Sequence, residues 1–423
     1  MVSRFPVGML AAMPPTPPPT PEPGEARVRD RGDACPGALR LHPADDGRLA
    51  RLRLPAGRLT ASQAETLAAA AETLGDGRIS ITSRGNAELR GLGDDCGAEL
   101  AALLSTAGLL PSPTHERVRN IVASPGAGLD GLGYADVQLW ARALDTALCA
   151  EPRAASLSGR FLFVLDDGRG DVAGLGGDVS LIAGEGGSAL LRLGPRVFWV
   201  AAADAVRAAL AAALAFLDAA EAAGNGAWRP RELPEEHVPD WAGALARAGI
   251  AAEPVSLPVP PLPVCPPPAP GVLGDRALHV LAPLGRLTAA QLRALAEGVE
   301  ELRLTPWRGA VVVGARADRL PALETYGLVT RPELPSVGVS ACTGRPGCAK
   351  SLADVRTDAG LVRRGGLPVH YSGCERRCGH PHGTWVDVLA TGDDTYLVDG
   401  VPTPRTALPE AVTTARSLPT HTR

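Results

Sequence analysis

Two stretches of this chain repeat one alternation of apolar and polar positions. RLRLPAGRLTASQ begins at Arg51, and HVLAPLGRLTAAQ begins at His279. In each, a strand-like run leads through a turn into a helical pattern preceded by Thr60 or Thr288, whose hydroxyl can cap the helix. Second strands are predicted within 78–84 and 301–307. Each copy is therefore predicted to be a βαβ unit with its helix packed on one face of a sheet.

The copies share a short motif, Gly-Arg-Leu-Thr-Ala followed one residue later by Gln, at 57–63 and 285–291. This spacing predicts an internal duplication with a pseudo-twofold arrangement, in which a ligand would sit at the seam. A longer α/β stretch follows each copy. The first contains a predicted helix within 134–150, strands within 159–168 and 196–202, and an alanine-rich helix from 203. The second is shorter, with strands within 383–391 and 395–400.

Two proline-rich tracts, at 14–23 and 254–270, divide the chain. Such tracts form extended or disordered segments, so we predict a disordered leader at 1–34 and a semi-rigid linker at 251–275. The remaining chain is assigned to a small module at 35–110, a large α/β module at 111–250, a second small module at 276–335 and a cysteine-bearing module at 336–415. The length of 423 residues accommodates this number of modules.

Charge and hydropathy limit the partners and the location. The net charge is −4 and the pI about 6.1, so no bulk positive field favours nucleic acid or an anionic membrane surface. The longest apolar run, at 208–217, is too short to span a bilayer. The N-terminus does not resemble a secretory signal. We therefore expect a cytoplasmic protein with reduced thiols, in which clustered cysteines indicate a metal site rather than disulfides.

Four cysteines have such a clustered spacing. Cys342 and Cys348 are separated by five residues, Cys374 and Cys378 by three, and twenty-five residues lie between the pairs. Zinc sites favour closer pairs, whereas a larger iron–sulfur cluster accepts wider and unequal loops. The spacing therefore favours a [4Fe–4S] cluster, with zinc and unliganded cysteines as alternatives. The other cysteines are scattered and are interpreted as incidental buried thiols: Cys35, Cys96, Cys149 and Cys265.

The cysteine spacing and the preceding duplication together resemble the nitrite and sulfite reductase family, whose four such cysteines bind a [4Fe–4S] cluster. The segments that carry the resemblance include LHPADDGRLARLRLPAGRLTASQ, TSRGNAELRGL, RVRNIVASPGAGLDG and LRLTPWRG, and it covers about residues 35–415. It implies an α+β fold of two small ferredoxin-like βαβ modules and two larger α/β modules in pseudo-twofold arrangement. Within the family, these sequence segments are similar to those of oxygenases that act on a tetrapyrrole in aerobic cobalamin synthesis.

Several arginines could bind a polycarboxylate, because each guanidinium can grip one carboxylate at two points. Arg117 and Arg119 would share one face if RVRN is a strand, and Arg84 and Arg90 share parity if the chain between them is extended. Taken alone, each of these residues is more often solvated or paired within the protein than part of a binding site. The resemblance implies a tetrapyrrole site that contains the following residues: Arg84, Arg90, Arg117, Arg119, Asn120, Arg160 and Arg308. It assigns no catalytic residue.

One departure separates the branches of the family. Sulfite reductases carry a segment similar to Leu-Pro-Arg-Lys-Phe-Lys, whose lysines contact the bound anion. The matching LSGRFLF places Arg160 at the first lysine and Leu162 at the second. A leucine cannot donate a proton, which argues against six-electron reduction of sulfite or nitrite. A sirohaem-dependent reductase, a non-catalytic tetrapyrrole-binding protein and a zinc-stabilised binding module remain alternatives.

The resemblance implies C20 hydroxylation of precorrin-3A with dioxygen, closure of a ring A lactone, and an external electron donor. Sirohaem is not required, but a mononuclear non-haem iron beside the cluster is expected. Its ligands would come from residues typical of such sites: His370, His380, His382, Asp166, Asp167 and Asp387. Asp166 and Asp167 could also form a plain turn, and Trp307 could flank a flat macrocycle or belong to the core. A monomer is preferred, because the duplication already supplies symmetry.

Overall fold

The computed structural model describes residues 33, 35–255, 265–360, 365–381 and 383–417. Four sheets organise this part of the chain. The central linker residues 256–264 and almost all of the predicted leader lie outside the described residues, while two short strands, at 252–254 and 271–273, fall within the predicted linker range. Among the described helices, none is both long and apolar enough to cross a membrane.

The first two sheets belong to the small modules and exchange strands. The first has the order β1 (His42–Ala44), β2 (Gly47–Leu52), β5 (Ala87–Leu92), β4 (Arg78–Ile81) and β14 (Arg286–Thr288). The second has the order β12 (Gly271–Leu273), β13 (Ala277–Leu281), β16 (Gly309–Val313), β15 (Glu301–Leu304) and β3 (Arg58–Leu59). Strand β14 comes from the second copy and β3 from the first, so each copy completes the sheet of the other.

The helices of the small modules begin where the repeated motif predicts. Thr60 caps α1 (Ala61–Leu74) and Thr288 caps α6 (Ala289–Ala296), each through a capping box with the Gln three residues later. The two helices pack against each other, and a single apolar core runs through both modules, with Leu67 and Leu292 fully buried in it. Helices α2 (Gly97–Thr106) and α7 (Leu320–Thr325) lie at its margins.

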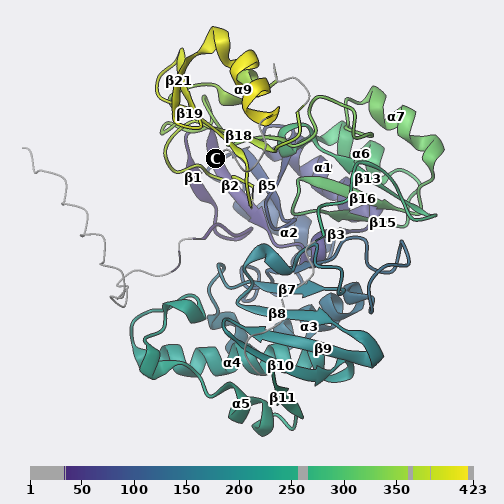
Figure 1. Cartoon of the computed structure of the whole chain (residues 1–423), viewed down its shortest axis with the longest axis vertical. Helices are drawn as coiled ribbons and strands as arrows, with labels where there is room; N and C mark the ends of the chain where they lie inside the picture. The colour runs from purple at the N-terminus through teal and green to yellow at the C-terminus, as the bar shows by residue number, and fades with distance from the viewer. Residues whose placement is uncertain (1–32, 34, 256–264, 361–364, 382, 418–423) are drawn as a thin grey trace, which may run out of the picture.

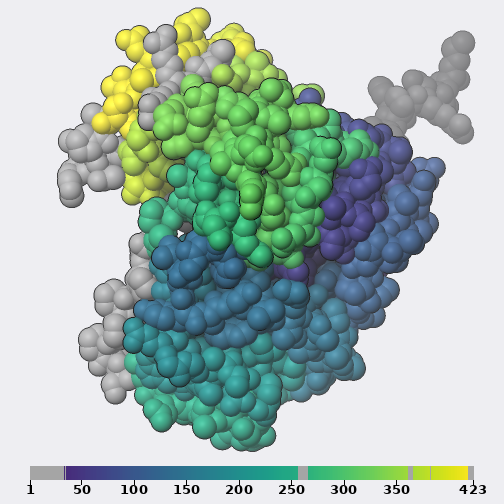
Figure 2. Space-filling view, turned by 90° about the vertical axis from the view of Figure 1, so that its right-hand side faces the viewer, coloured from purple at the N-terminus to yellow at the C-terminus, as the bar shows by residue number. Residues whose placement is uncertain are grey.

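The third sheet forms the large module. Its order is β11 (Ala252–Pro254), β10 (Arg196–Ala201), β9 (Ser188–Leu193), β8 (Val179–Ala183), β7 (Phe163–Asp166) and β6 (Ile121–Ala123), and β6, β7 and β8 are parallel. Helices α3 (Val137–Ala150), α4 (Ala205–Ala223) and α5 (Trp241–Arg247) enclose the module's own core. Figure 1 shows this module as the lower lobe, and Figure 2 shows the second small module, in green, resting directly on it.

The fourth sheet forms the cysteine-bearing module. Strands β17 (Val339–Ala341), β18 (Val369–Ser372) and β19 (Val386–Ala390) are parallel, and β20 (Thr395–Val398) and β21 (Val401–Pro404) continue the sheet antiparallel. Helices α8 (Val355–Ala359) and α9 (Leu408–Ser417) cover it. Strand order and direction match those from β6 to β10 in the third sheet. The predicted α+β architecture of two small and two larger modules is thus confirmed.

Candidate functional site

A chain of buried hydrogen bonds joins four segments that carry conspicuous arginines. The Asn86 side chain accepts from the Leu54 N–H at 2.9 Å and donates to the Asn120 side chain at 3.1 Å. Asn120 in turn donates to the Phe161 carbonyl at 3.0 Å. These amides are almost completely buried. These hydrogen bonds therefore hold side by side the chain segments that immediately follow four arginines: Arg53, Arg84, Arg119 and Arg160.

Arg53 is the most unusual of these arginines, because its guanidinium is buried and unpaired. The side chain is 4% exposed, and its Nε and Nη1 have no hydrogen-bond partner among the described residues. Its Nη2 reaches only the Gly159 carbonyl, at 3.4 Å. Burial, with a further contribution from the positive charges of Arg51 and Arg84, lowers the pKa of Arg53 to about 9. A buried cation in this state provides a binding position for an anion.

The segment after Gly159 brings Arg160 and Arg84 to the same place. Arg84 donates through Nη2 to the Arg160 carbonyl at 3.4 Å, and burial lowers its pKa to about 10. The Arg160 guanidinium lies over the Trp228 ring, 4.8 Å from its centroid. Asp178 supports the segment by accepting from the Leu162 N–H at 2.9 Å while paired with Arg229.

Arg117 and Arg119, which the sequence also predicted as binding residues, have partners of their own within the protein. Residues 113–118 form turns and β6 begins only at Ile121, so the predicted strand through Arg117 and Arg119 is wrong. Arg119 is 5% exposed and makes a two-point ion pair with Asp145, at 2.7 Å for each bond. Arg117 donates to the Asp33 carbonyl at 3.1 Å.

Arg84 and Arg90 also do not share an extended segment. Strand β4 ends at Ile81, β5 begins at Ala87, and Gly85 between them adopts a φ of 68°. The predicted parity of the two arginines is therefore wrong, because the chain turns. Arg90 lies on β5 and is 7% exposed, with its guanidinium bound by Asp46 and Glu88.

An apolar surface adjoins the cationic group. Leu162 is 2% exposed and belongs to a small cluster with Val122, Val164 and Val172, against which Trp307 packs. Trp307 is half-buried and meets the His279 ring edge-on, with centroids 6.4 Å apart. It comes from the second small module, whereas Leu162 comes from the large module. The position that would carry a second cation in the anion-reducing pattern thus contributes to an apolar contact between modules.

The four cysteines lie in the loops at one edge of the fourth sheet. Cys342 directly follows β17, and Cys374 follows the neighbouring parallel strand β18 by two residues. Because carboxyl ends of parallel strands meet at one edge, the two cysteine pairs are brought together there. The loops are joined by the Leu352 N–H donating to the Gly373 carbonyl at 2.8 Å, and by the Gly373 N–H donating to Cys342 Sγ at 3.2 Å.

Histidines and charged residues surround these loops. His370 is fully buried. Its Nδ1 forms a hydrogen bond with Ser340 Oγ at 2.8 Å, and its Nε2 forms one with the Cys378 carbonyl at 3.1 Å. Burial, together with the nearby charge of Arg308, lowers its pKa to about 3, so this histidine is neutral. His380 stacks on Trp385, with centroids 5.3 Å apart. His382 lies outside the described residues.

Arg308 connects the second small module to the cysteine loops. Its Nη2 donates to the Gly379 carbonyl at 2.5 Å, next to Cys378. The residue adopts a φ of 64°, and burial lowers its pKa. Asp387, another predicted iron ligand, pairs with Arg377 at 2.8 Å, and its buried Oδ1 has no partner among the described residues. Arg308 thus reaches the cysteine loops from the second small module, whereas Asp387 lies on β19 of the cysteine-bearing module itself.

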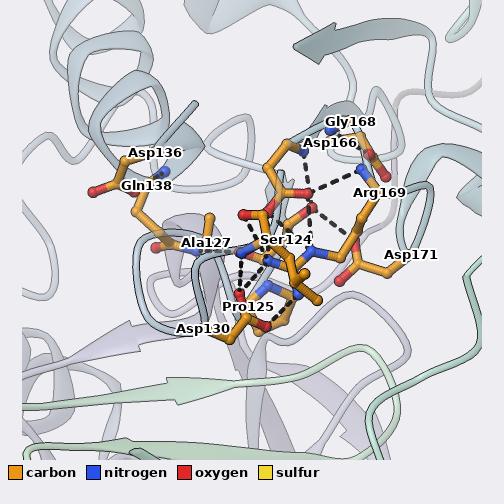
Figure 3. A network of polar contacts seen from close by, with 12 residues as sticks. Ser124, Pro125, Ala127, Asp130, Asp136, Gln138, Asp166, Gly168, Arg169 and Asp171 are labelled. Carbon is orange, nitrogen blue, oxygen red and sulfur yellow. Dashed lines mark hydrogen bonds and ion pairs between the residues drawn. The ribbon is translucent and has the colours of Figure 1, made fainter. Parts of the chain in front are cut away.

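Asp166 belongs to a polar network in the large module that also contains Asp130, Arg169 and Asp171 (Figure 3). The two oxygens of Asp166 accept four backbone N–H groups, from residues 168, 170, 172 and 173. Asp167 pairs with Arg169, which also binds Asp130. Asp171 accepts from Ser124 Oγ at 2.6 Å, and burial, aided by the nearby aspartates, raises its pKa to about 7. The hydrogen bonds of Asp166 confirm the turn interpretation.

Comparison with known proteins bears on both halves of the site. The model of the nitrite/sulfite reductase ferredoxin-like half domain matches residues 42–105 and 273–326, the two modules that exchange strands. These two modules are therefore similar to the ferredoxin-like half domains of nitrite and sulfite reductases. The fold agrees, because the NirA protein of Mycobacterium tuberculosis superposes with a TM-score of 0.67 at 18% identity, covering 86% of this chain and 79% of that one.

Two relatives with different names align with this chain to a similar extent. A ferredoxin–nitrite reductase of Synechococcus elongatus is 27% identical over 411 residues, which cover 85% of this chain and 80% of the relative. A precorrin-3B synthase of a Sinorhizobium species is 28% identical over 384 residues, which cover 83% and 79%. The likeness therefore supports an oxidoreductase, and the residues of the site must distinguish the two reactions.

Arg53 is the site residue that the sequence interpretation missed. The signal was present, because Arg51 and Arg53 stand two apart in RLRLPAG, the same spacing that drew attention to Arg117 and Arg119. Arg51 meets Glu88 at 2.6 Å, whereas Arg53 turns to the buried junction. Trp228 was missed because nothing near it in the sequence marks it as a partner of Arg160.

Proposed function

We propose that this protein is a precorrin-3B synthase, which hydroxylates precorrin-3A at C20 and closes the ring A lactone with dioxygen. The observation that carries the proposal is Arg53, a buried guanidinium beside Arg84 and Arg160, two of whose nitrogens have no partner among the described residues. A bound anion would offset the cost of burying this charge. A tetrapyrrole with many acetate and propionate groups supplies such anions.

Both the apolar ring and the peripheral carboxylates of a tetrapyrrole would find suitable partners in this junction. The macrocycle is flat and apolar, and Trp307 with Leu162 offers an apolar surface between modules. The peripheral carboxylates are anionic, and Arg53 and Arg84 offer guanidinium N–H groups, which bind carboxylates through strong charge-assisted hydrogen bonds. Arg160, held over Trp228, would meet a third carboxylate. Of the arginines implied by the resemblance, Arg84, Arg160 and Arg308 are retained in this proposal.

The cysteine loops suit an iron–sulfur cluster better than a single ion. One zinc ion holds its sulfurs at about 2.3 Å, which brings them close to one another. In the described residues, the only group of three or more potential ligand atoms within 4.8 Å is the aspartate network, so the four sulfurs are spread more widely. The Gly373 N–H that points at Cys342 Sγ is the kind of donor that stabilises a cluster's sulfurs. When bound, a [4Fe–4S] cluster supplies one-electron transfer.

The chain's own residues fit oxygenation of a bound macrocycle better than reduction of a small anion. Leu162 offers no proton at the position where the anion-reducing pattern has a lysine, and it is buried against its neighbours. Hydroxylation needs two electrons beyond those of the substrate, so an external donor is part of the proposal. A mononuclear iron would add oxygen activation, and no ligand set for it is assembled among the described histidines and carboxylates beyond the aspartate network.

The test is aerobic incubation of the cluster-loaded protein with precorrin-3A and a reductant, followed by mass measurement. The expected product carries one added oxygen atom. The second candidate is a sirohaem nitrite reductase, which the ferredoxin–nitrite reductase relative favours. Strong Soret-region absorption of the purified protein, together with reduction of nitrite and no oxygenated product, would replace the first proposal by the second.

A further inference from the structure

The turn between β1 and β2 reaches across to the loop that carries Cys348. Asp45 accepts through Oδ2 from the Ala349 N–H at 2.5 Å. Arg90 donates through Nη2 to the Gly347 carbonyl at 2.8 Å. These two contacts hold the residues immediately before and after Cys348. They join parts of the chain that are 304 and 257 residues apart.

Arg90 is already fully engaged in this arrangement. Its Nε and Nη2 bind the two oxygens of Asp46, each at 2.9 Å, and its Nη1 lies 3.4 Å from Glu88 Oε1. Since every nitrogen has a partner within the protein and the residue is 7% exposed, no fork of N–H groups remains for a carboxylate of a substrate. The opposing carboxylates, together with the hydrogen bonds, raise the pKa of Arg90 against the effect of burial.

The fit of the turn against the cysteine loop is close. A Cβ placed on Gly347 would lie 2.7 Å from Asp46 Oδ2, so a larger residue here would displace the Asp46 carboxylate. The second small module makes the corresponding contact on the other cysteine pair, where Arg308 donates to the Gly379 carbonyl beside Cys378. Each half of the duplicated pair thus holds one loop of the cysteine-bearing module. The contact on Cys348 uses an ion pair, whereas that on Cys378 uses a single arginine.

We propose that Asp45, Asp46 and Arg90 form a latch that positions Cys348 as a ligand of the iron–sulfur cluster. The proposal rests on the proposed cluster and gives Arg90 a role different from the substrate contact that the family resemblance implies. Asp46 orients the guanidinium, Arg90 and Asp45 fix the backbone on both sides of the cysteine, and the sulfur is held at the cluster position. These are positioning residues. Partners of this kind are expected to control metal retention and to tune redox potential.

The test uses the full-length, cluster-loaded protein and the variants Arg90→Gln, Arg90→Lys, Asp45→Ala and Asp45→Asn. Iron and acid-labile sulfide per chain, the rate of cluster loss to a chelator, and the midpoint potential in an EPR-monitored titration are measured. Arg90→Gln and Asp45→Ala are expected to lose the cluster about 10- to 100-fold faster and to shift the potential. Lysine at 90 can still donate to the Gly347 carbonyl, and asparagine at 45 can still accept from Ala349, so both should restore part of the retention.

Arg48→Gln is the matched control, because Arg48 belongs to the same sheet but pairs with Asp94, whose side chain is largely exposed, at 2.5 Å. It should leave cluster loss and potential unchanged. Asp45 is exposed, so its variants disturb no core even if Arg90→Gln folds poorly. Wild-type protein without iron and sulfide would overturn the proposed function itself. A stable wild-type cluster with unchanged loss rate and potential in Asp45→Ala and Arg90→Gln would overturn the latch alone.

Discussion

Arg53 offers the sharpest separation between a binding residue and a structural one. We predict that Arg53→Met weakens binding of the tetrapyrrole substrate and at the same time stabilises the fold. The reason is that two guanidinium nitrogens are buried without a partner in the described part of the chain, so the wild-type protein bears the cost of a desolvated charge in its free state. Methionine has a similar reach, carries no charge and adapts to irregular cavities.

The magnitudes follow from the pKa of Arg53 and from hydrogen-bond energies. Lowering the pKa from 12.5 to about 9 corresponds to roughly 5 kcal/mol of destabilisation at neutral pH, at about 1.4 kcal/mol for each unit, as an upper bound. The variant should recover on the order of 1–4 kcal/mol of this. Loss of two charge-assisted hydrogen bonds, at about 1.5 kcal/mol or more each, should raise the dissociation constant at least about 100-fold.

The pH dependence has a definite sign. Because the folded state holds its Arg53 proton less tightly than the unfolded state, the wild-type penalty is complete below about pH 9 and declines as pH rises above it. The difference in stability between variant and wild type should therefore be constant from pH 6 to 8. Urea denaturation measures the stability, and quenching of intrinsic fluorescence by the tetrapyrrole measures binding. A variant that is several kcal/mol less stable, with substrate affinity intact, would refute this reasoning and make Arg53 a structural residue.

Two further predictions concern the fold and its buried charges. Thr60→Ala and Thr288→Ala each remove a capping-box hydroxyl and should lower the free energy of unfolding by about 1 kcal/mol, measured by urea denaturation. Thr66→Ala is the control, because the Thr66 hydroxyl donates only to a carbonyl of its own helix. Equal effects at all three positions would contradict the capping role. Burial raises the pKa of Asp171 to about 7, so the wild-type carboxyl binds its proton more tightly in the folded state and stability falls as the pH rises from about 4 to 7. Asp171→Asn should make this fall smaller. Thermal unfolding across this pH range measures the slope, and an unchanged slope would exclude Asp171 as its source.

The sequence predicted the elements whose signals are local and missed those that depend on distant partners. The caps at Thr60 and Thr288, the helices that follow them and the strand at 78–81 are each determined by a few neighbouring residues. The strand β3 was not predicted, because two residues carry no periodicity and its partner β15 lies more than 240 residues away. The prediction that Arg84 and Arg90 share one face was wrong, because Gly85 has a positive φ and the chain turns where an extended run had been assumed.

The exchanged strands explain why one short motif recurs in both copies. Gly57 must be glycine, because it adopts a φ of 70° and a Cβ would lie 1.9 Å from the Leu304 carbonyl oxygen of the other copy. Leu59 then pairs with Leu302, and Thr60 begins the helix of its own copy. One motif thus ends a sheet in one module and starts a helix in the other. Neither small module has a complete sheet without its partner, so each module depends on the other for its edge strand.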